Sequence, residues 1–276
     1  MLGFGASKNA AAAAAATAPG PMYPDPMIMG TTGGLLFTIH TVVWLLLISY
    51  GQQSRAEAHL GAHFVAVLLG FSALAAVGVY GWLLFPEPHP EPNLVMGVTF
   101  AGNAACNMMT AFQTYEVTLS LIAPMLRGKH YEMIGHHVVT LALAVMGGVF
   151  SYLDHQAVFF FGFSELSSIP LSVVDLMKQY PGLPSRYPQL HELSRTLFAV
   201  SFLAVRVLYW PIVSYRFWAD SLPQLGAGFV PMYVAYSYLV SNILLTGLQF
   251  FWGSLILRAL AKMAKGGKGG KASKAE

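Results

Sequence analysis

Residues 127–180 read RGKHYEMIGHHVVTLALAVMGGVFSYLDHQAVFFFGFSELSSIPLSVVDLMKQY, two apolar segments joined by the short polar turn SYLDH. Four ionisable side chains are set among the hydrophobic residues of these segments: His136, His137, Glu165 and Asp175. An ionisable group inside a segment long enough to cross a membrane is costly, so it marks a functional site by default. The stretch therefore predicts two neighbouring membrane helices that carry a polar site.

The composition of the whole chain agrees with a membrane protein. Hydrophobic residues make up 55% of the 276 residues and charged residues only 10%, against about 25% charged residues in soluble proteins. A chain of this length is enough for six or seven spans of about 20 residues with short loops, without a further soluble domain. The single cysteine, Cys106, excludes an intrachain disulfide framework.

Seven hydrophobic segments, separated by turn-forming stretches, follow one another along the chain near residues 33–50, 60–85, 94–123, 131–152, 155–177, 192–217 and 229–260. A transmembrane β-barrel would show short alternating segments, so these spans are predicted to be helices. We expect an all-α membrane protein, a bundle of about seven transmembrane helices over residues 31–262. Residues 1–30 are expected to form a disordered N-terminal tail, and residues 263–276 a basic, flexible C-terminal tail.

The basic residues predict the orientation of the bundle. Those that fall in or beside the first, third and fifth loops are Arg55, Arg127, Lys129, Lys178, Arg186 and Arg195. Arg258 and five lysines lie at the C-terminal end, whereas only Lys8 and Arg216 lie on the opposite side. Because basic residues are enriched in cytosolic loops, the C-terminus is predicted to be cytosolic.

The histidine stretch also resembles a known family. A His136–His137 pair is followed by Val and Thr, Ser151–Tyr152 comes about a dozen residues later, and a second helix carries the sequence ELSSIPL at 165–171. These features resemble those of TLC-domain proteins, which include the ceramide synthases and smaller proteins linked to membrane lipid composition. The resemblance is close over residues 127–180 and looser over 35–260.

One departure separates the chain from the ceramide synthases. In the second helix those enzymes carry His-Asp followed by Ser-Asp, and the matching positions here look like Ser164–Glu165 and Ser167–Ser168. One carboxylate is therefore kept as Glu165, and Ser168 replaces the other. This pattern resembles the smaller family members more than the authentic synthases. The resemblance implies an endoplasmic reticulum membrane, with the plasma membrane as the alternative.

The histidine pair is the main candidate for catalysis. His136 and His137 lie five or six residues into the fourth span, which places them roughly 8 Å below its cytosolic end. Adjacent helical residues point about 100° apart, so we expect one imidazole to face the centre of the bundle and the other to support it. The functional interpretation is a general base or an acyl-accepting nucleophile. The alternative is a pair of structural histidines.

Glu165 could orient an imidazole, hold a substrate amine or be a protonated structural carboxyl. A metal site is the competing interpretation, because Glu132 and His136 lie at i and i+4. Membrane di-iron enzymes need several His-rich boxes, however, and the other histidines are scattered singly. We therefore predict no metal and no cofactor, with acyl-CoA as the co-substrate of an acyltransferase.

Polar residues on other spans are candidates for binding substrate. Asn103, Asn107, Thr110 and Thr114 share one face of the third span, where hydrogen bonding between helices is the alternative role. Arg206, in the middle of the sixth span, is the natural counter-charge of Glu116 or Glu165, since an unpaired Arg there would be costly. The predicted substrate-binding set is Ser168, Asp175, Glu116, Arg206, Asn107 and Asn242.

Two functions follow from these observations. The first is an acyl-CoA-dependent N-acyltransfer to a lipid amine, and the second is a non-catalytic regulator that binds lipid and alters membrane composition. A receptor or retinal pump is disfavoured because residues 229–260 contain no Lys for a Schiff base. The expected partners are membrane lipid, acyl-CoA and a second copy of the chain in a homodimer, but no nucleic acid.

Overall fold

The computed structural model describes residues 23–272, except residues 52, 88–94, 96 and 123–130. The side chains of residues 131, 132 and 264–272 are also outside the description. The predicted N-terminal tail therefore falls outside the described residues as far as residue 22. The helix α2 begins at Pro26, so the last residues of that predicted tail are helical. The helix α11 continues through the predicted C-terminal tail to Ala272.

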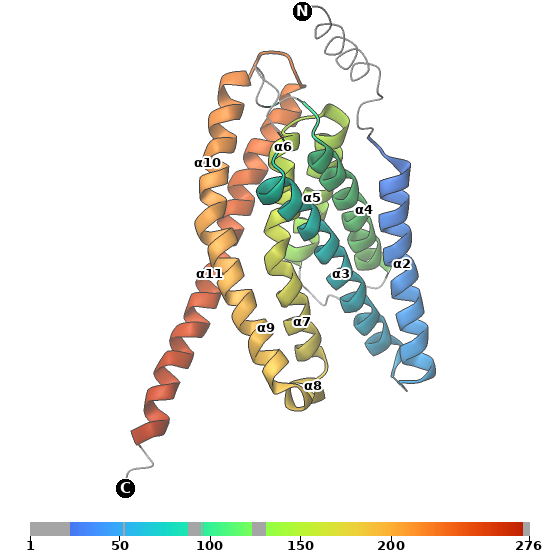
Figure 1. The fold of residues 1–276 in the computed structure, drawn as a ribbon, viewed down its shortest axis with the longest axis vertical. Helices are drawn as coiled ribbons and strands as arrows, with labels where there is room; N and C mark the ends of the chain where they lie inside the picture. Colours follow the sequence, from blue (N-terminus) through green and yellow to red (C-terminus); the bar gives the residue numbers. More distant parts are fainter. Residues whose placement is uncertain (1–22, 52, 88–94, 96, 123–130, 273–276) are drawn as a thin grey trace, which may run out of the picture.

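The described chain forms one bundle of long helices, with no β-strand among the residues described (Figure 1). In chain order the elements are α2 (Pro26–Ser49), α3 (Arg55–Val79), η1 (Tyr80–Leu84), α4 (Phe100–Ile122), α5 (Tyr131–Phe150), α6 (Asp154–Ala157), η3 (Val158–Gly162), η4 (Phe163–Ser167), α7 (Ser168–Gln179), α8 (Gly182–Arg186), α9 (Pro188–Ser201), η5 (Phe202–Tyr209), α10 (Trp210–Ser221), η6 (Leu222–Gln224) and α11 (Met232–Ala272). The segments η1, η3 and η5 are wider π-helical turns, and η4 and η6 are tighter 3-10 turns.

Six helical stretches in the described part of the chain are long and apolar enough to cross a membrane. The seventh long helix of the bundle, α4, is not among them. Its 23 residues would rise about 35 Å, so its length suffices, but its mean hydropathy is lowered by polar side chains. Most of those side chains are buried, because α4 packs against α2, α3 and α5. The predicted bundle of about seven helices is confirmed, and one of its members is a polar helix in the interior.

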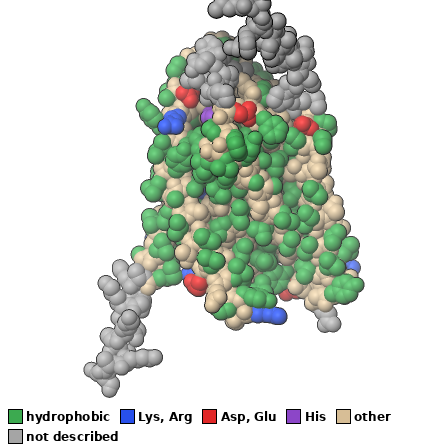
Figure 2. All heavy atoms as spheres, in the orientation of Figure 1, with side chains coloured by type: hydrophobic (Ala, Val, Ile, Leu, Met, Phe, Trp, Pro, Cys, Tyr) green, Lys and Arg blue, Asp and Glu red, His purple; other side chains and the backbone are tan. Residues whose placement is uncertain are grey.

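The outside of the bundle is apolar between its two ends. In Figure 2, hydrophobic side chains cover the visible face, and charged side chains gather toward the ends. Helix α11 and the N-terminal helix α2 expose many large apolar side chains, such as Leu45, Ile243 and Phe251. Such a surface would be unusual on a soluble protein and fits contact with lipid. The chain is an integral membrane protein.

Polar caps fix the ends of the inner helices. Asp154, at the start of α6, accepts hydrogen bonds from the backbone N–H and the hydroxyl of Thr99 at 2.7 and 2.8 Å. Glu87 accepts from the N–H groups of Phe100 and Ala101 at 2.9 and 3.0 Å. These carboxylates satisfy backbone donors that the first turn of α4 leaves without intrahelical partners. Asp154 ties the start of α4 to the turn that follows α5, and Glu87 ties it to the segment that follows η1.

The span of residues 154–179 is the most irregular in the bundle. It changes from a π-helical turn to a 3-10 turn and then to α-helix just before Pro170. Proline lacks an N–H and collides with the carbonyl four residues earlier, so a disturbed helix is expected there. Gly78 of α3 lies directly against the backbone at Gly162 and Phe163, where a Cβ atom would collide. This contact presses η4, which carries Glu165, onto α3.

Candidate functional site

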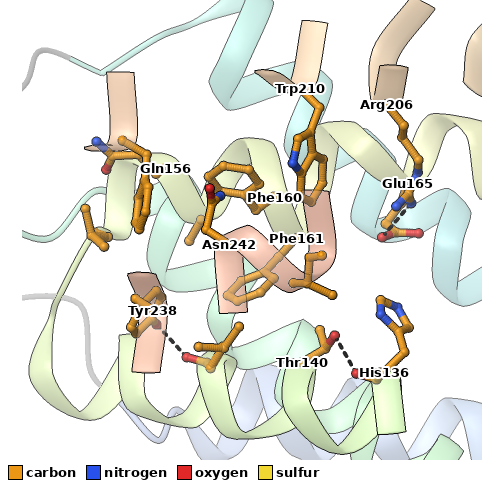
Figure 3. Close-up of a pocket in the computed structure, with 15 residues that line it drawn as sticks. His136, Thr140, Gln156, Phe160, Phe161, Glu165, Arg206, Trp210, Tyr238 and Asn242 are labelled. Atoms are coloured by element: carbon orange, nitrogen blue, oxygen red, sulfur yellow. Dashed lines mark hydrogen bonds and ion pairs between the residues drawn. The ribbon is translucent and has the colours of Figure 1, made fainter. Parts of the chain in front are cut away.

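A cavity lies inside the bundle between α5, the span of residues 154–179, α10 and α11 (Figure 3). Its lining consists of His136, Thr140, Leu143, Leu153, Gln156, Ala157, Phe160, Phe161, Glu165, Arg206, Trp210, Phe217, Tyr238, Asn242 and Leu245. The protein atoms leave about 640 Å³ of space here, the open mouth included, and about 50 Å³ is open to the centres of water-sized molecules. That smaller volume has room for roughly three to five waters, so the cavity is narrow.

An ion pair occupies one end of the cavity. Arg206 Nη2 lies 3.1 Å from Glu165 Oε1, and both side chains are about nine-tenths buried. Ser168 donates a hydrogen bond to Glu165 Oε2 at 2.5 Å, and Arg206 donates from Nε to Ser167 Oγ at 2.8 Å. The predicted pairing of Arg206 with a carboxylate is confirmed, and the partner is Glu165. Two serines complete the hydrogen bonding that such a buried pair requires.

His136 faces this ion pair from the opposite wall. Figure 3 shows its imidazole directed from α5 toward the side of the cavity where Glu165 and Arg206 lie. The ring of Trp252 on α11 stands edge-on to the imidazole, with the ring centroids 6.1 Å apart. The carbonyl of His136 accepts a hydrogen bond from Thr140, which also lines the cavity. His136 is thus the member of the histidine pair that meets the cavity.

His137 belongs to a different, buried polar cluster between α3, α4 and α5. Its Nδ1 lies 2.6 Å from Gln113 Oε1, and its Nε2 lies 3.5 Å from Glu116 Oε2. The other oxygen of Glu116 lies 3.7 Å from His63 Nδ1. Because an amide oxygen only accepts, Nδ1 of His137 donates to Gln113, and Nε2 lies toward the carboxylate of Glu116. The adjacent histidines therefore point into separate environments, as their helical spacing predicts.

A chain of aromatic and histidine side chains extends from this cluster toward α2. His40 Nδ1 lies 2.9 Å from the Tyr115 hydroxyl, and His40 Nε2 lies 3.1 Å from His59 Nδ1. Trp44 stacks on the His59 ring. These histidines are scattered singly in the sequence, and the network between them was not predicted. The available signal was the spacing of four between His59 and His63, which places both on one face of α3.

The remainder of the cavity wall is mainly apolar and aromatic. Phe160, Phe161, Trp210 and Phe217 surround it together with aliphatic side chains, and its polar members are Thr140, Gln156, Tyr238 and Asn242. On α5 the lining extends from His136 to Leu143, a rise of about 10 Å. The site thus joins the charged end to a mainly aromatic channel.

The match to a family model covers residues 59–258, more than half of the chain, and the family is described as the TLC domain. The chain belongs to the TLC-domain family. The matched residues include every helix that lines the cavity. No curated protein and no solved structure gives a significant match to the chain.

Several residues predicted to bind substrate in this TLC domain do not line the cavity. Asn107 accepts a hydrogen bond from the Asp25 N–H at 2.8 Å and holds the start of α2. Asp175 pairs at the surface with Lys178 at 2.8 Å. Glu116 lies in the buried cluster with His137, and Ser168 supports the ion pair from behind the cavity wall. Thr114, predicted on the polar face of α4, is exposed.

Asn242 does line the cavity of the TLC domain, and its amide is held by neighbours. Its Oδ1 accepts from Trp218 Nε1 at 3.0 Å, and its Nδ2 donates to Ser214 Oγ at 3.2 Å. Within the described residues, no group of three or more His, Cys, Asp and Glu side chains could hold a metal ion. The side chain of Glu132, considered as a ligand beside His136, is outside the description.

Proposed function

We propose that the protein transfers a fatty-acyl group from acyl-CoA to a lipid amine, with His136 as the acyl-accepting residue. The observation that supports this most directly is that one imidazole and one carboxylate–guanidinium pair meet in a mainly apolar cavity inside the bundle. Ligand pockets commonly combine apolar walls with a few polar groups, and this cavity has that combination.

The shape of the site suits an acyl lipid. The aromatic channel would hold the hydrocarbon chain, because burying each CH₂ contributes about 0.8 kcal/mol. The reactive end of the chain would then lie beside His136 and the Glu165–Arg206 pair. Because the cavity is narrow, it favours a thin hydrocarbon chain over a compact, bulky ligand. This arrangement would bring a carbonyl carbon to the His136 imidazole.

The proposed reaction has two steps. The unprotonated nitrogen of the His136 imidazole attacks the thioester carbonyl, a carbon–nitrogen bond forms, and the carbon–sulfur bond breaks. The coenzyme A thiolate leaves and takes up the proton released from the other imidazole nitrogen. The lipid amine then attacks the acyl-imidazole, forms the amide and returns a proton to the histidine. The sum converts a thioester and an amine into an amide and a thiol.

Glu165 and Arg206 would act on the amine. A lipid ammonium that approaches His136 would meet the carboxylate of Glu165, which the guanidinium fixes in position, and it would give one proton to water before the neutral amine attacks. Electrostatic interactions of this kind are strong where water is excluded. His137 is proposed to position His136 rather than to react, since its ring nitrogens are directed at Gln113 and Glu116.

The second candidate is a non-catalytic regulator that binds phospholipid or fatty-acyl chains in the same cavity. One observation favours it: Glu165 is already engaged by Arg206 and Ser168, so no carboxylate at the ion pair is free to remove a proton. Ser168 also stands where ceramide synthases carry an Asp. Such a protein would change membrane phospholipid composition and fluidity through partners.

The two candidates differ in turnover. Purified protein reconstituted in liposomes should convert acyl-CoA and a panel of long-chain amines into amides, detected by lipid mass spectrometry. A His136→Ala preparation of equal folded fraction serves as the control. Release of coenzyme A without amide, or amide formation at the same rate by the control, would contradict the proposed function. Bound lipid without turnover in wild type would support the regulator.

We further propose that the protein resides in the endoplasmic reticulum, with its C-terminus in the cytosol.

A further inference from the structure

Most of the side chains that line the cavity are buried, and the few that keep some exposure show where it opens. His136 of α5 and Tyr238 and Leu245 of α11 are partly exposed. Phe160 is partly exposed too, but its ring packs inside the bundle against Trp210. The lining residues that η5 and α10 supply are all buried. The cavity therefore opens sideways, where α5 and α11 face each other.

The other side of α11 is fastened to η5 and α10. The indole N–H groups of Trp210 and Trp218 donate hydrogen bonds to side chains of α11 at 2.9 and 3.0 Å. Farther along α11, Gly253 lies so close to η5 that an added Cβ atom would lie 2.6 Å from the side chain of Val207. Hydrogen bonds and close backbone approach hold membrane helices together. The seam between α11 and α10 is therefore the closed one.

Toward α5, two contacts mark the ends of the opening. Tyr238 donates to the carbonyl of Leu143 at 2.6 Å, and the ring of Trp252 stands edge-on to His136 with the ring centroids 6.1 Å apart. Figure 3 shows Tyr238 and His136 at opposite ends of the α5 wall. The helix α11 rises about 21 Å from Tyr238 to Trp252, and Leu245 lies halfway between them. The opening is thus long and narrow, as a hydrocarbon chain is.

The opening faces lipid. Both α5 and α11 contain stretches long and apolar enough to cross a membrane, and α11 exposes Ile243, Leu244 and Phe251 along the same part of the helix. At this depth the surroundings are hydrocarbon, so a water-soluble molecule would have to leave its hydration shell to arrive here. The acyl chain of a bilayer lipid already lies there. Such a chain can turn into the cavity without crossing water.

We propose that the seam between α5 and α11 is the entrance by which the acyl chain of a membrane lipid moves from the bilayer into the cavity, and that Trp252 closes it. The inference rests on the cavity and not on a reaction, so it applies to the acyltransferase and to the regulator alike. Trp252 is partly exposed and is not among the residues that line the cavity. Its ring therefore stands in the route of the chain rather than in the wall that binds it.

A side chain in the route has a kinetic signature. It changes the barrier, so it alters the association and dissociation rates by the same factor and leaves Kd unchanged, whereas most changes to a binding surface alter mainly dissociation. Loss of an edge-on aromatic contact corresponds to about 2- to 10-fold in rate. Trp252→Ala should therefore raise both rates by a factor in this range. Trp252→Phe, which keeps an aromatic edge, should stay near wild type.

The probe is tritiated palmitic acid, a single unbranched chain. Its exchange is followed by scintillation proximity on purified protein in phosphatidylcholine nanodiscs, and specific binding is the signal that excess unlabelled palmitic acid removes. No acyl-CoA is present, so no reaction occurs. Trp218→Phe removes an indole hydrogen bond between α10 and α11, and it should keep both rates. Faster exchange in Trp218→Phe but not in Trp252→Ala would place the entrance at the other seam and overturn the proposal.

A second pair of variants tests obstruction, and it decides the matter if Trp252→Ala fails to fold. Leu245→Trp places a large ring in the middle of the opening and should slow association several-fold. Gly247→Trp places the same ring on an exposed side of α11, where no atom lies within 4 Å of an added Cβ, and should exchange like wild type. Equal association rates in these two variants would overturn the proposal. So would a change confined to Kd in Trp252→Ala, or the absence of specific palmitic acid binding to wild type.

Turnover measured on the same preparations separates the entrance from the proposed function. If Trp252→Ala exchanges palmitic acid faster than wild type and wild type makes no amide from acyl-CoA and amine, the acyltransferase assignment fails and the entrance stands. If wild type makes amide in a His136-dependent reaction and Trp252→Ala exchanges palmitic acid at the wild-type rate, the entrance fails and the acyltransferase assignment stands.

Discussion

His136 and His137 are adjacent in sequence, but they make different contributions because helical geometry turns them about 100° apart. The first lines the cavity, and the second hydrogen-bonds Gln113. We expect His136→Ala to abolish amide formation while the protein stays folded and inserted. His137→Ala should instead lower the free energy of unfolding by about 1–3 kcal/mol, the cost of a lost buried hydrogen bond.

Specific activity per folded molecule distinguishes these two outcomes. His191→Ala, in α9 outside the cavity, serves as a matched histidine control and should behave like wild type. Equal specific activity in all three variants would rule out a catalytic histidine. Loss of specific activity in His137→Ala alone would reverse the assignment of the two rings.

The buried ion pair gives a second prediction at the scale of residues. Arg206→Leu leaves the carboxylate of Glu165 buried without its counter-charge, so the free energy of unfolding should fall by about 3–5 kcal/mol. Changing Glu165 to Gln in that background should recover part of the loss, because a neutral amide is less costly to bury than a charge. Equilibrium unfolding in mixed micelles measures both effects.

Lys178→Met is the matched control for the ion pair. Its partner Asp175 lies on the exposed surface, and surface pairs contribute about 0–1 kcal/mol. A loss in Arg206→Leu no larger than in this control would show that the buried pair does not hold the bundle together. Absence of any recovery with Glu165→Gln would show that the arginine stabilises the fold through other contacts.

At the scale of elements, the packing of α3 against η4 depends on two glycines. A Cβ atom at Gly78 would collide with the backbone of Gly162 and Phe163, which cannot move as a side-chain tip can. We expect Gly78→Ala to lower the free energy of unfolding by about 1–3 kcal/mol, a usual cost of overpacking. Because η4 carries Glu165, the variant should also weaken binding of long-chain amines.

Gly247→Ala is the control, since no atom lies within 4 Å of a Cβ built there. In a helix this change should raise the free energy of unfolding by about 0.5–1 kcal/mol. Thermal unfolding of the two variants gives the comparison. If both variants melt like wild type, α3 and η4 have enough freedom to separate, and the glycine contact does not position the site.

Most elements could be predicted from the sequence because apolar segments and turn-forming stretches alternate along it. The span near residues 94–123 was predicted as well, and its helix α4 tolerates a polar face because its neighbours cover Asn103, Gln113 and Glu116. The exception has a physical cause. The irregular turns at residues 158–167 depend on Pro170 together with the packing against Gly78, and only the proline is visible as a local signal.

The site was predictable to a lesser extent. The pairing of Arg206 follows from charge and depth alone, which is why it could be stated from the sequence. The choice of Glu165 over Glu116 depends on which helices are neighbours, and this is a tertiary property. For the same reason Asn107 was predicted to bind substrate. Its side chain instead accepts a hydrogen bond from the Asp25 N–H and so joins α4 to the start of α2.

At the scale of the whole molecule, the bundle has two unlike ends. The α2–α3 turn, helix α8 with its flanking turns and the C-terminal part of α11 lie at one end, whereas the start of α2 lies at the other (Figure 1). The end at which the α2–α3 turn, α8 and the C-terminal part of α11 lie carries Arg55, Lys178 and Arg186. Because basic residues mark the cytosolic face, we predict that this end is cytosolic.

The orientation decides how acyl-CoA would reach the site, since this co-substrate is expected to approach from the cytosol. His136 lies in the second turn of α5, near the end of the bundle that we assign to the cytosol.

A tag placed after Glu276 should be accessible to antibody when only the plasma membrane is permeabilised. A tag placed before Met1 should become accessible only when internal membranes are opened as well, because an odd number of spans puts the two ends on opposite sides. Protection of the C-terminal tag would reverse the orientation, place His136 at the lumenal side and remove the route proposed for acyl-CoA. Equal accessibility of both tags would instead mean an even number of spans, and the first candidate for a helix that does not cross the membrane would be the polar α4.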